Sequence, residues 1–229
     1  MVRVWTLWAA LVAALLGATG AGAQCRLALL LALDVSASVD ELEDNLQRQG
    51  LANALLAPDV VDAFLAFPDH PVALAAFEWS GRWQQDLMLD WTLVRGAEDL
   101  LQAARTIQAS QRQRSDLPTA LGYALGHAAG VFARGPKCDA AKLDVSGDGI
   151  NNDGFPPTSA YRAFDLGSVI VNGLAISTDG QPIADYYRNS VIRGRGAFVI
   201  EAHGFEDFED AMRRKLLREL RGPVIGRVQ

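Results

Sequence analysis

Residues 26–38 read RLALLLALDVSAS, an apolar run that changes abruptly to polar residues at Asp34. An apolar run without polar alternation is typical of a strand that is covered on both faces. The turn that follows carries three oxygen-bearing side chains at alternate positions, Asp34, Ser36 and Ser38. This stretch therefore predicts an α/β domain whose first strand ends in a polar loop.

Strand-like and helix-like patterns alternate along the rest of the chain. We predict strands over residues 72–79, 84–91, 142–146, 169–176 and 197–201, and helices over 38–57, 59–65, 96–109, 119–132, 184–191 and 205–220. The short connection at residues 80–83 predicts a hairpin, which makes 84–91 an antiparallel edge strand. The alternation predicts one domain with a mostly parallel central sheet and helices on both faces.

The first residues have the pattern of a secretory signal peptide. Arg3 precedes an apolar run over residues 4–16, and small residues lead to Ala23. The run is too short to cross a bilayer, and no later apolar stretch is long enough to do so. We therefore predict cleavage after Ala23, a mature domain over 24–229, and a periplasmic or secreted protein.

The composition narrows the class of partner. The chain has 229 residues, half of them apolar, and a formal net charge of −6. The basic residues form a cluster only at 213–215. An acidic protein without a basic face is not expected to bind nucleic acid. The composition leaves the oligomeric state open.

The loop at residues 34–38 can be interpreted in two ways. A carboxylate and two hydroxyls are hard oxygen donors, the ligands that magnesium, manganese or calcium prefers. Serine and aspartate are also common in turns between a strand and a helix, and Ser38 and Glu41 have the spacing of a helix capping box. The loop alone leaves both interpretations open.

Two later segments make the pattern more specific. DVSAS at residues 34–38 resembles the first segment of the metal-ion-dependent adhesion site of von Willebrand factor A domains. Thr119, in DLPTAL, and Asp148, in the Asp-Gly pair that ends a predicted strand, match the site's other two segments in chain order. This sequence departs from the pattern at Pro118, where many such domains have glycine or serine.

The resemblance implies a fold and a function. The fold is a three-layer Rossmann-like von Willebrand factor A fold. Ser36 and Ser38 would bind a divalent ion, Mg²⁺ or else Mn²⁺ or Ca²⁺, directly, and Asp34, Thr119 and Asp148 would bind it directly or through water. A carboxylate from a protein partner would fill the open coordination position. The resemblance also implies that the last helix, 205–220, can shift when the ligand binds.

Further segments resemble a bacterial exported family known as domain of unknown function 1194. They are residues 144–152, 170–176, 186–187 and 196–199. The resemblance covers nearly the whole mature chain. It implies the fold but no established activity.

The two cysteines occupy similar positions relative to two acids. Cys25 lies nine residues before Asp34, and Cys138 lies ten residues before Asp148. If both acids end neighbouring parallel strands, both cysteines begin them. We therefore predict a Cys25–Cys138 disulfide, which an exported protein can keep.

Two other functions are possible for this sequence. A metal-dependent hydrolase of the aspartyl-nucleophile type needs a second aspartate where this chain has Ser36. His70, His127 and His203 are scattered and have no nucleophile elbow nearby. The other alternative is a structural domain with an unoccupied site.

For several residues, a purely structural role is possible beside a functional one. Residues 144–155 resemble a calcium loop but have Phe155 where the bidentate glutamate belongs, so we interpret Asp144 as a structural acid. Asn151 and Asn152 either line the metal site or satisfy the backbone of the turn. The tryptophans around the hairpin belong either to the core or to an exposed patch; they are Trp79, Trp83 and Trp91.

Overall fold

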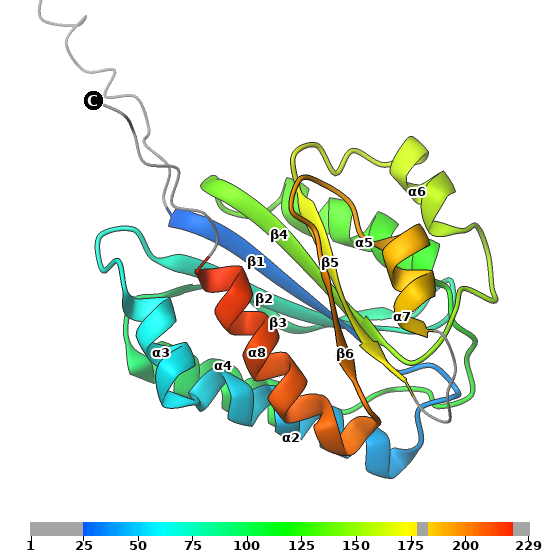
Figure 1. The fold of residues 1–229 in the computed structure, drawn as a ribbon, viewed down its shortest axis with the longest axis horizontal. Helices are drawn as coiled ribbons and strands as arrows, with labels where there is room; N and C mark the ends of the chain where they lie inside the picture. Colours follow the sequence, from blue (N-terminus) through cyan, green and yellow to red (C-terminus); the bar gives the residue numbers. More distant parts are fainter. Residues whose placement is uncertain (1–24, 178–182, 222–229) are drawn as a thin grey trace, which may run out of the picture.

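The computed structural model describes residues 25–177 and 183–221, and its centre is a six-stranded sheet in the order β3-β2-β1-β4-β5-β6 (Figure 1). The strands are β1 (Cys25–Asp34), β2 (Val72–Trp79), β3 (Gln85–Val94), β4 (Cys138–Gly147), β5 (Ile170–Ile176) and β6 (Val199–Ala202). Among these six strands, only β3 pairs antiparallel with its neighbour. The predicted mostly parallel sheet with one antiparallel edge strand is confirmed. The predicted signal peptide, residues 1–23, lies outside the described residues.

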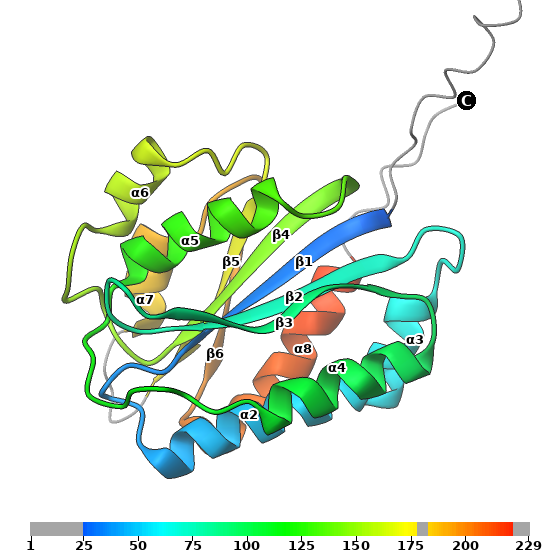
Figure 2. The same ribbon diagram turned by 180° about the vertical axis from the view of Figure 1, so that it is seen from behind.

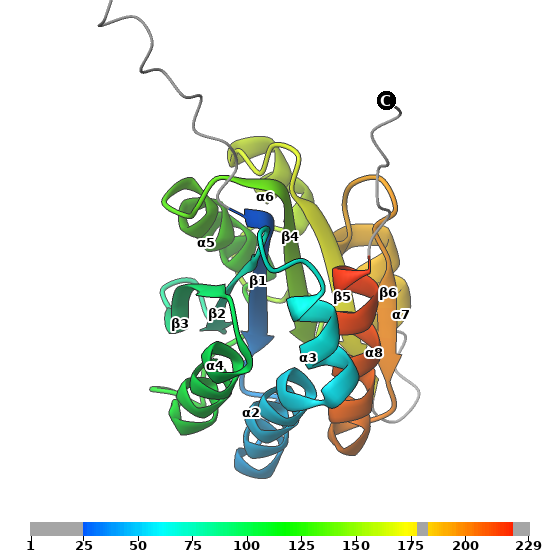
Figure 3. The same ribbon diagram turned by 90° about the vertical axis from the view of Figure 1, so that its left-hand side faces the viewer.

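Helices cover both faces of the sheet, as predicted. They are α2 (Glu41–Leu56), α3 (Pro58–Leu65), α4 (Ala97–Ala109), α5 (Leu121–Ala133), α6 (Pro157–Ala163), α7 (Ile183–Tyr186) and α8 (Phe208–Leu220). Figure 3 shows α2, α3, α4 and α8 below the sheet and α5 and α6 above it. Along β1, Leu29 and Leu31 pack into the core with α2, α3, α4 and α8, whereas Leu30 and Ala32 pack into the core with α5 and α6. The three-layer architecture is thus confirmed.

The layer below the sheet is built around α2. Figure 2 shows α4 alongside α2, and α8 also packs against α2.

None of the helices in the described part of the chain combines the length and the apolar character that a membrane span requires.

The strand order reverses beside β1, which is flanked by β2 and β4. In parallel α/β sheets, ligands bind beyond the carboxyl ends of the strands at such a switch point. Leu33 of β1 pairs with Ser146 of β4. The chain therefore leaves both strands side by side, and the loops that carry Asp34 and Asp148 start next to each other.

The opposite end of the same strand pair holds the predicted disulfide. Cys25 pairs in register with Cys138, and a Cys25–Cys138 bond joins them, with their Cα atoms 4.5 Å apart. The strand pair is thus linked covalently at its amino end, and the site residues lie at its carboxyl end.

The predicted cap of α2 is wrong. The capping box consists of Asp40 and Glu43, not Ser38 and Glu41. Asp40 Oδ1 accepts a hydrogen bond from the Glu43 amide at 2.9 Å, and Glu43 Oε2 accepts one from the Asp40 amide at 2.7 Å. Because Asp40 takes the capping role, the Ser38 hydroxyl is available for contacts elsewhere.

Other elements also differ from the predictions. β4 begins at Cys138, four residues before the predicted start, and the predicted helix 184–191 consists of α7 followed by a π-helical turn, η2 (Tyr187–Val191). The last helix begins with a 3₁₀ turn, η3 (Phe205–Asp207). α6 was not predicted. This helix has 7 residues and begins at Pro157, and it is too short for a helical period to be recognised in the sequence.

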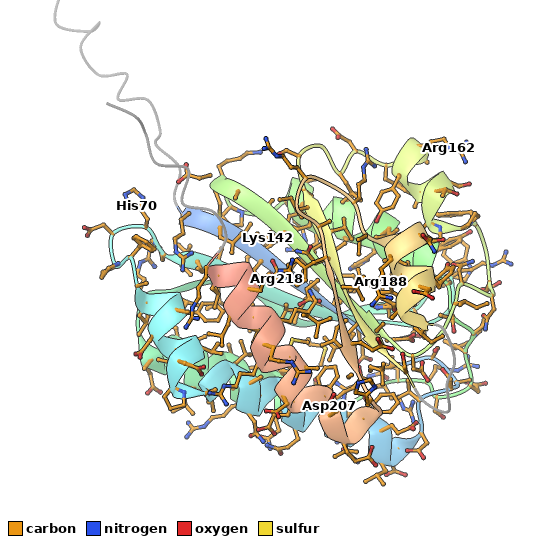
Figure 4. All side chains as sticks on the ribbon, in the orientation of Figure 1. His70, Lys142, Arg162, Arg188, Asp207 and Arg218 are labelled. Atoms are coloured by element: carbon orange, nitrogen blue, oxygen red, sulfur yellow. A yellow bond between two sulfur atoms is a disulfide. The ribbon has the colours of Figure 1, made fainter. Side chains whose placement is uncertain are left out.

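Buried charges fix α8 to the sheet. Lys215 Nζ lies 2.7 Å from Asp144 Oδ1 on β4 and 3.1 Å from Glu219 Oε1 on α8 itself. Lys142, labelled beside α8 in Figure 4, lies 3.3 Å from the other oxygen of Glu219. Asp144, Lys215 and Glu219 are buried. Asp144 is therefore a structural acid with its own cation, as predicted, and burial raises its pKa to about 6 although Lys215 lowers it.

Candidate metal centre

The structure brings the five predicted metal ligands together at the carboxyl ends of β1 and β4. Thr119 Oγ1 lies 3.2 Å from Ser36 Oγ, which lies 3.2 Å from Ser38 Oγ. Ser38 Oγ donates a hydrogen bond to Asp148 Oδ1 at 2.8 Å. Three loops that are far apart in sequence are thus joined by a continuous chain of side-chain oxygens, and Asp34 lies at its base.

Asp34 is held rigidly but leaves one oxygen free. The side chain is buried, and its Oδ1 accepts a hydrogen bond from the Ser36 amide at 2.9 Å. Gln47 Nε2 donates to the Asp34 carbonyl oxygen at 2.9 Å. Asp34 Oδ2 is also buried and has no hydrogen-bond partner. A buried carboxylate oxygen without a partner is unusual and requires an explanation.

The electrostatics of the two acids are uncompensated. Burial, followed by the charge of Asp148, raises the pKa of Asp34 to about 8. Burial also raises the pKa of Asp148, although the hydrogen bond from Ser38 lowers it. Among the described residues, no lysine, arginine or histidine forms an ion pair with either acid. A bound cation would supply the missing positive charge.

Thr119 is positioned by the loop after β4. Asn152 Oδ1 accepts a hydrogen bond from the Thr119 amide at 2.8 Å, and the Asn152 amide donates to the Thr119 carbonyl at 3.0 Å. The side chain of Asn151 accepts a bond from the Gly122 amide at 3.2 Å. Both asparagines thus satisfy turn backbone. The prediction that the helix starts at Thr119 is wrong, because α5 begins at Leu121. The Thr119 hydroxyl nevertheless faces Ser36, although Pro118 precedes it.

Two residues of the site were missed by sequence reasoning. Gln47 holds the Asp34 carbonyl from α2, and Gly147 approaches Asp34 so closely that a Cβ there would lie 2.7 Å from Asp34 Oδ2. The Asp-Gly pattern drew attention to the glycine after Asp148 and not to the one before it. No spacing rule connects Gln47 with a strand end thirteen residues earlier.

The donor set fits a hard divalent cation. All five side chains offer oxygen, and two of them are acids, which suits Mg²⁺, Mn²⁺ or Ca²⁺ better than a nitrogen- and sulfur-seeking ion. In the described ranges, 25–177 and 183–221, no group of three or more His, Cys, Asp or Glu side chains is arranged to hold a metal. The site thus depends on hydroxyls as well as acids.

The three histidines lie apart from these oxygens. His127 is on α5, where its ring contacts Phe77 at a centroid distance of 4.9 Å and burial lowers its pKa. His70 follows α3, and His203 follows β6. None of them hydrogen-bonds to a site residue in the described part of the chain.

The surface beside Thr119 has an exposed aromatic ring. Trp83 is 88% exposed, whereas Trp79 belongs to the core and Trp91 is half-buried, with its ring N–H donating to the Val131 carbonyl. Trp83 and Pro118 help to line a hollow of about 270 Å³. Trp79 therefore belongs to the core and Trp83 to the exposed surface, the two roles predicted for these residues, and Trp91 lies between them.

The fold is that of known von Willebrand factor A proteins. A solved structure of proximal thread matrix protein 1 from the mussel byssus, with a zinc-occupied MIDAS motif, has a TM-score of 0.59 at 15% identity over 87% of this chain and 49% of that chain. The von Willebrand factor type A protein from Catenulispora acidiphila has a TM-score of 0.59 at 13% identity, over 86% and 43% of the two chains. This chain spans less than half the length of either protein.

A third structure matches over almost its full length. BatB, a conserved hypothetical protein from Bacteroides thetaiotaomicron, has a TM-score of 0.55 at 14% identity over 85% of this chain and 98% of its own. These low identities show the fold alone. Among curated proteins, no relative matches.

Sequence comparison identifies the family. The family described as "Protein of unknown function (DUF1194)" matches residues 24–224, which is nearly the whole chain after the predicted signal peptide. The chain therefore belongs to the DUF1194 family and has a von Willebrand factor A-like fold.

Proposed function

We propose that this protein is an exported binding module that recognises an acidic group on a protein partner through a divalent cation. The cation would be held by Asp34, Ser36, Ser38, Thr119 and Asp148. The observation that carries the proposal is the Asp34 carboxylate, which is buried, has an unpartnered oxygen and forms no ion pair with a described basic side chain.

The choice of a divalent cation follows from charge and donor type. Two acids of one site repel each other when both are ionised, and an ion between them removes that repulsion. The mussel protein carries zinc in its MIDAS motif on the same fold, which supports a divalent ion here. The oxygen-only donor set favours Mg²⁺, Mn²⁺ or Ca²⁺ as the resident ion.

The choice of an acidic partner follows from the coordination that remains. Hydroxyls carry no charge, so the chain supplies only two negative charges to a doubly charged ion. Such an ion can take a further anionic ligand from outside. Ser38 and Asp148 lie at the more exposed side of the site, and the exposed ring of Trp83 adds contact surface on the neighbouring hairpin.

Export is supported by two separate features. The signal-like pattern at residues 1–23 predicts secretion. The Cys25–Cys138 disulfide suits an oxidising compartment such as the periplasm or the extracellular space.

The test is a calorimetric titration of Mg²⁺, Mn²⁺, Ca²⁺ and Zn²⁺ into the metal-stripped mature protein. Wild type is expected to bind one ion, and Asp34→Ala and Asp148→Ala are expected to abolish binding. Asp153→Ala is the matched control, because Asp153 lies in the same loop as Asp148 but pairs with Arg82 instead of the site. If none of the four ions binds the wild type at millimolar concentration, the proposal fails.

A second measurement separates a binding module from an enzyme. Immobilised protein is exposed to acidic peptides and to the same peptides with Glu and Asp replaced by Gln and Asn, with Mg²⁺ or with a chelator. We expect retention of the acidic peptides only, and only with metal. Turnover of phosphoester or peptide substrates that is lost in Asp34→Ala would instead support a metal-dependent hydrolase.

A further inference from the structure

A second unpartnered oxygen lies beside Asp34. Tyr187 is fully buried, and its hydroxyl has no hydrogen-bond partner. A Cβ placed on Gly147 would lie 2.6 Å from Tyr187 Oη and 2.7 Å from Asp34 Oδ2. The phenol oxygen and the free carboxylate oxygen therefore face each other across the position where glycine has no side chain.

The fold makes room for this ring in two places. A Cβ on Gly147 of β4 would collide with the Tyr187 hydroxyl, and a Cβ on Gly173 of β5 would lie 2.7 Å from Cδ1 of the same ring. The ring thus lies against two glycines on neighbouring strands. A side chain at either position would therefore force the Tyr187 ring to shift.

The backbone that carries Tyr187 is also unusual. The π-helical turn η2 begins at this residue, and the Ile192 amide donates to the Tyr187 carbonyl at 3.0 Å, five residues apart. Single π turns are rare and occur frequently at functional sites. Here the turn fixes the direction in which the Tyr187 ring enters the core.

We propose that Tyr187 is a positioning residue of the metal centre, whose hydroxyl donates a hydrogen bond to Asp34 Oδ2, directly or through one water, once that carboxylate is ionised and holds the cation. The inference rests on the proposed function, because it assigns Tyr187 a role toward the cation bound by Asp34. The bond stabilises the ionised carboxylate and holds it in the orientation that a cation needs, as hydrogen bonds to metal-ligating carboxylates do elsewhere.

The chemistry of the phenol suits a donor role. A phenol carries one O–H, which can donate one hydrogen bond. Asp34 Oδ2 is a buried oxygen without a partner on the other side of the Gly147 position, so it is the acceptor that the geometry offers.

The experiment compares Tyr187→Phe with wild type and with Tyr161→Phe. Phenylalanine keeps the ring and removes only the hydroxyl. Tyr161 is the control for the turn itself, since its partly buried hydroxyl donates to the carbonyl of Val191, the last residue of η2, and not to a residue of the metal centre. The dissociation constant of Mn²⁺ is measured by calorimetry, and the melting temperature of each metal-free protein is measured beside it.

We expect Tyr187→Phe to bind Mn²⁺ about ten-fold more weakly than wild type. Its metal-free melting temperature is expected to stay unchanged or to rise, because an unpaired buried oxygen is removed. Tyr161→Phe should bind Mn²⁺ as wild type does. An unchanged affinity in Tyr187→Phe would overturn the inference, and so would a lower affinity accompanied by a lower metal-free melting temperature, which indicates a packing role.

Failure of the proposed function gives a different result, because wild type itself then binds no ion, and the role of Tyr187 fails with it. If Tyr187→Phe does not fold, the near-ultraviolet difference spectrum of wild type with and without Mg²⁺ replaces it. A tyrosine band that persists in Tyr161→Phe and is lost in Asp34→Ala supports the inference. Absence of that band from wild type that binds Mg²⁺ contradicts it.

Discussion

Two pairs of acids, both associated with β4, are treated in opposite ways. Beneath α8, Asp144 and Glu219 are buried together with Lys215, and Lys142 contacts Glu219 from the sheet. Beyond the end of the same strand, Asp34 and Asp148 have hydroxyls and amides around them but no described basic partner. One cluster contains its own cations, and the other does not.

The difference indicates which cluster is for structure and which is for binding. Burying a charge is unfavourable unless it is paired, and a paired cluster can contribute to a stable fold without any ligand. A cluster of acids without a partner makes the fold less stable until a cation arrives. The comparison predicts that substitutions at the two clusters have opposite effects on the metal-free protein.

The largest expected effect is at the paired cluster. Lys215→Met leaves Asp144 buried without a cation and should lower the free energy of unfolding by about 3–5 kcal/mol. Without Lys215, the pKa of Asp144 should rise further above its ordinary value. A carboxyl whose pKa is higher in the folded than in the unfolded protein favours the folded state at low pH, and this contribution is lost as the pH rises. The deficit should therefore be larger at pH 8 than at pH 5 in urea unfolding.

Lys137→Met, on an exposed lysine, is the control for that series and should change stability by less than about 0.5 kcal/mol. If Lys215→Met is as stable as Lys137→Met at pH 8, the paired cluster is not what holds α8.

The next effect is the response to metal. Mg²⁺ at a hundred times its dissociation constant should stabilise wild type by about 2.7 kcal/mol. Asp34→Asn should show no such gain. Thermal melts with Mg²⁺ and with a chelator measure both. An equal gain in the two proteins would place the ion somewhere other than the metal centre.

A smaller effect of opposite sign is expected without metal. Asp34→Asn removes a buried acid that the metal-free protein can hold only by keeping it protonated or by leaving its charge uncompensated, and it should stabilise that protein by about 1–3 kcal/mol. Folding raises the pKa of Asp34 from 3.8 to about 8. Wild type therefore loses stability as the pH rises through the range between these two pKa values, and the variant, which has no carboxyl there, does not. The gain should therefore grow between pH 5 and pH 8. Destabilisation at pH 8 would break the comparison between the clusters.

The smallest effect concerns the support of Thr119. Asn152→Ala removes the side chain that accepts from the Thr119 amide and should weaken Mn²⁺ binding about ten-fold. Gln49→Ala, an exposed amide on α2, should leave the affinity unchanged. Equal affinities in both variants would mean that the backbone bonds alone position Thr119.

Much of the fold could be predicted because its signals are local. The unbroken apolar run before Asp34 shows a strand covered on both faces, and the change to polar residues shows where it ends. The chain order of the DVSAS loop, Thr119 and Asp148 then placed three loops at one edge of the sheet. The positions of Cys25 and Cys138 followed from the same register.

The parts that were missed depend on contacts between distant residues. Ser38-x-x-Glu41 and Asp40-x-x-Glu43 fit a capping box equally well, and the contact of Ser38 with Asp148, 110 residues away, distinguishes them only in the folded chain. Tyr187 reaches Asp34 because two glycines lack side chains and a π turn sets its direction. Neither feature has a sequence signal of its own.

The disulfide also determines how the domain responds to mechanical force. A pull between the chain before Cys25 and the chain after Cys138 passes through the sulfur bridge and bypasses the chain between two cysteines whose sequence separation is 113. Asp34, Ser36, Ser38 and Thr119 lie inside this covalent loop and are shielded from the tension. Asp148 lies outside it, so of the five predicted ligands only this aspartate is on the stretch of chain that carries the load.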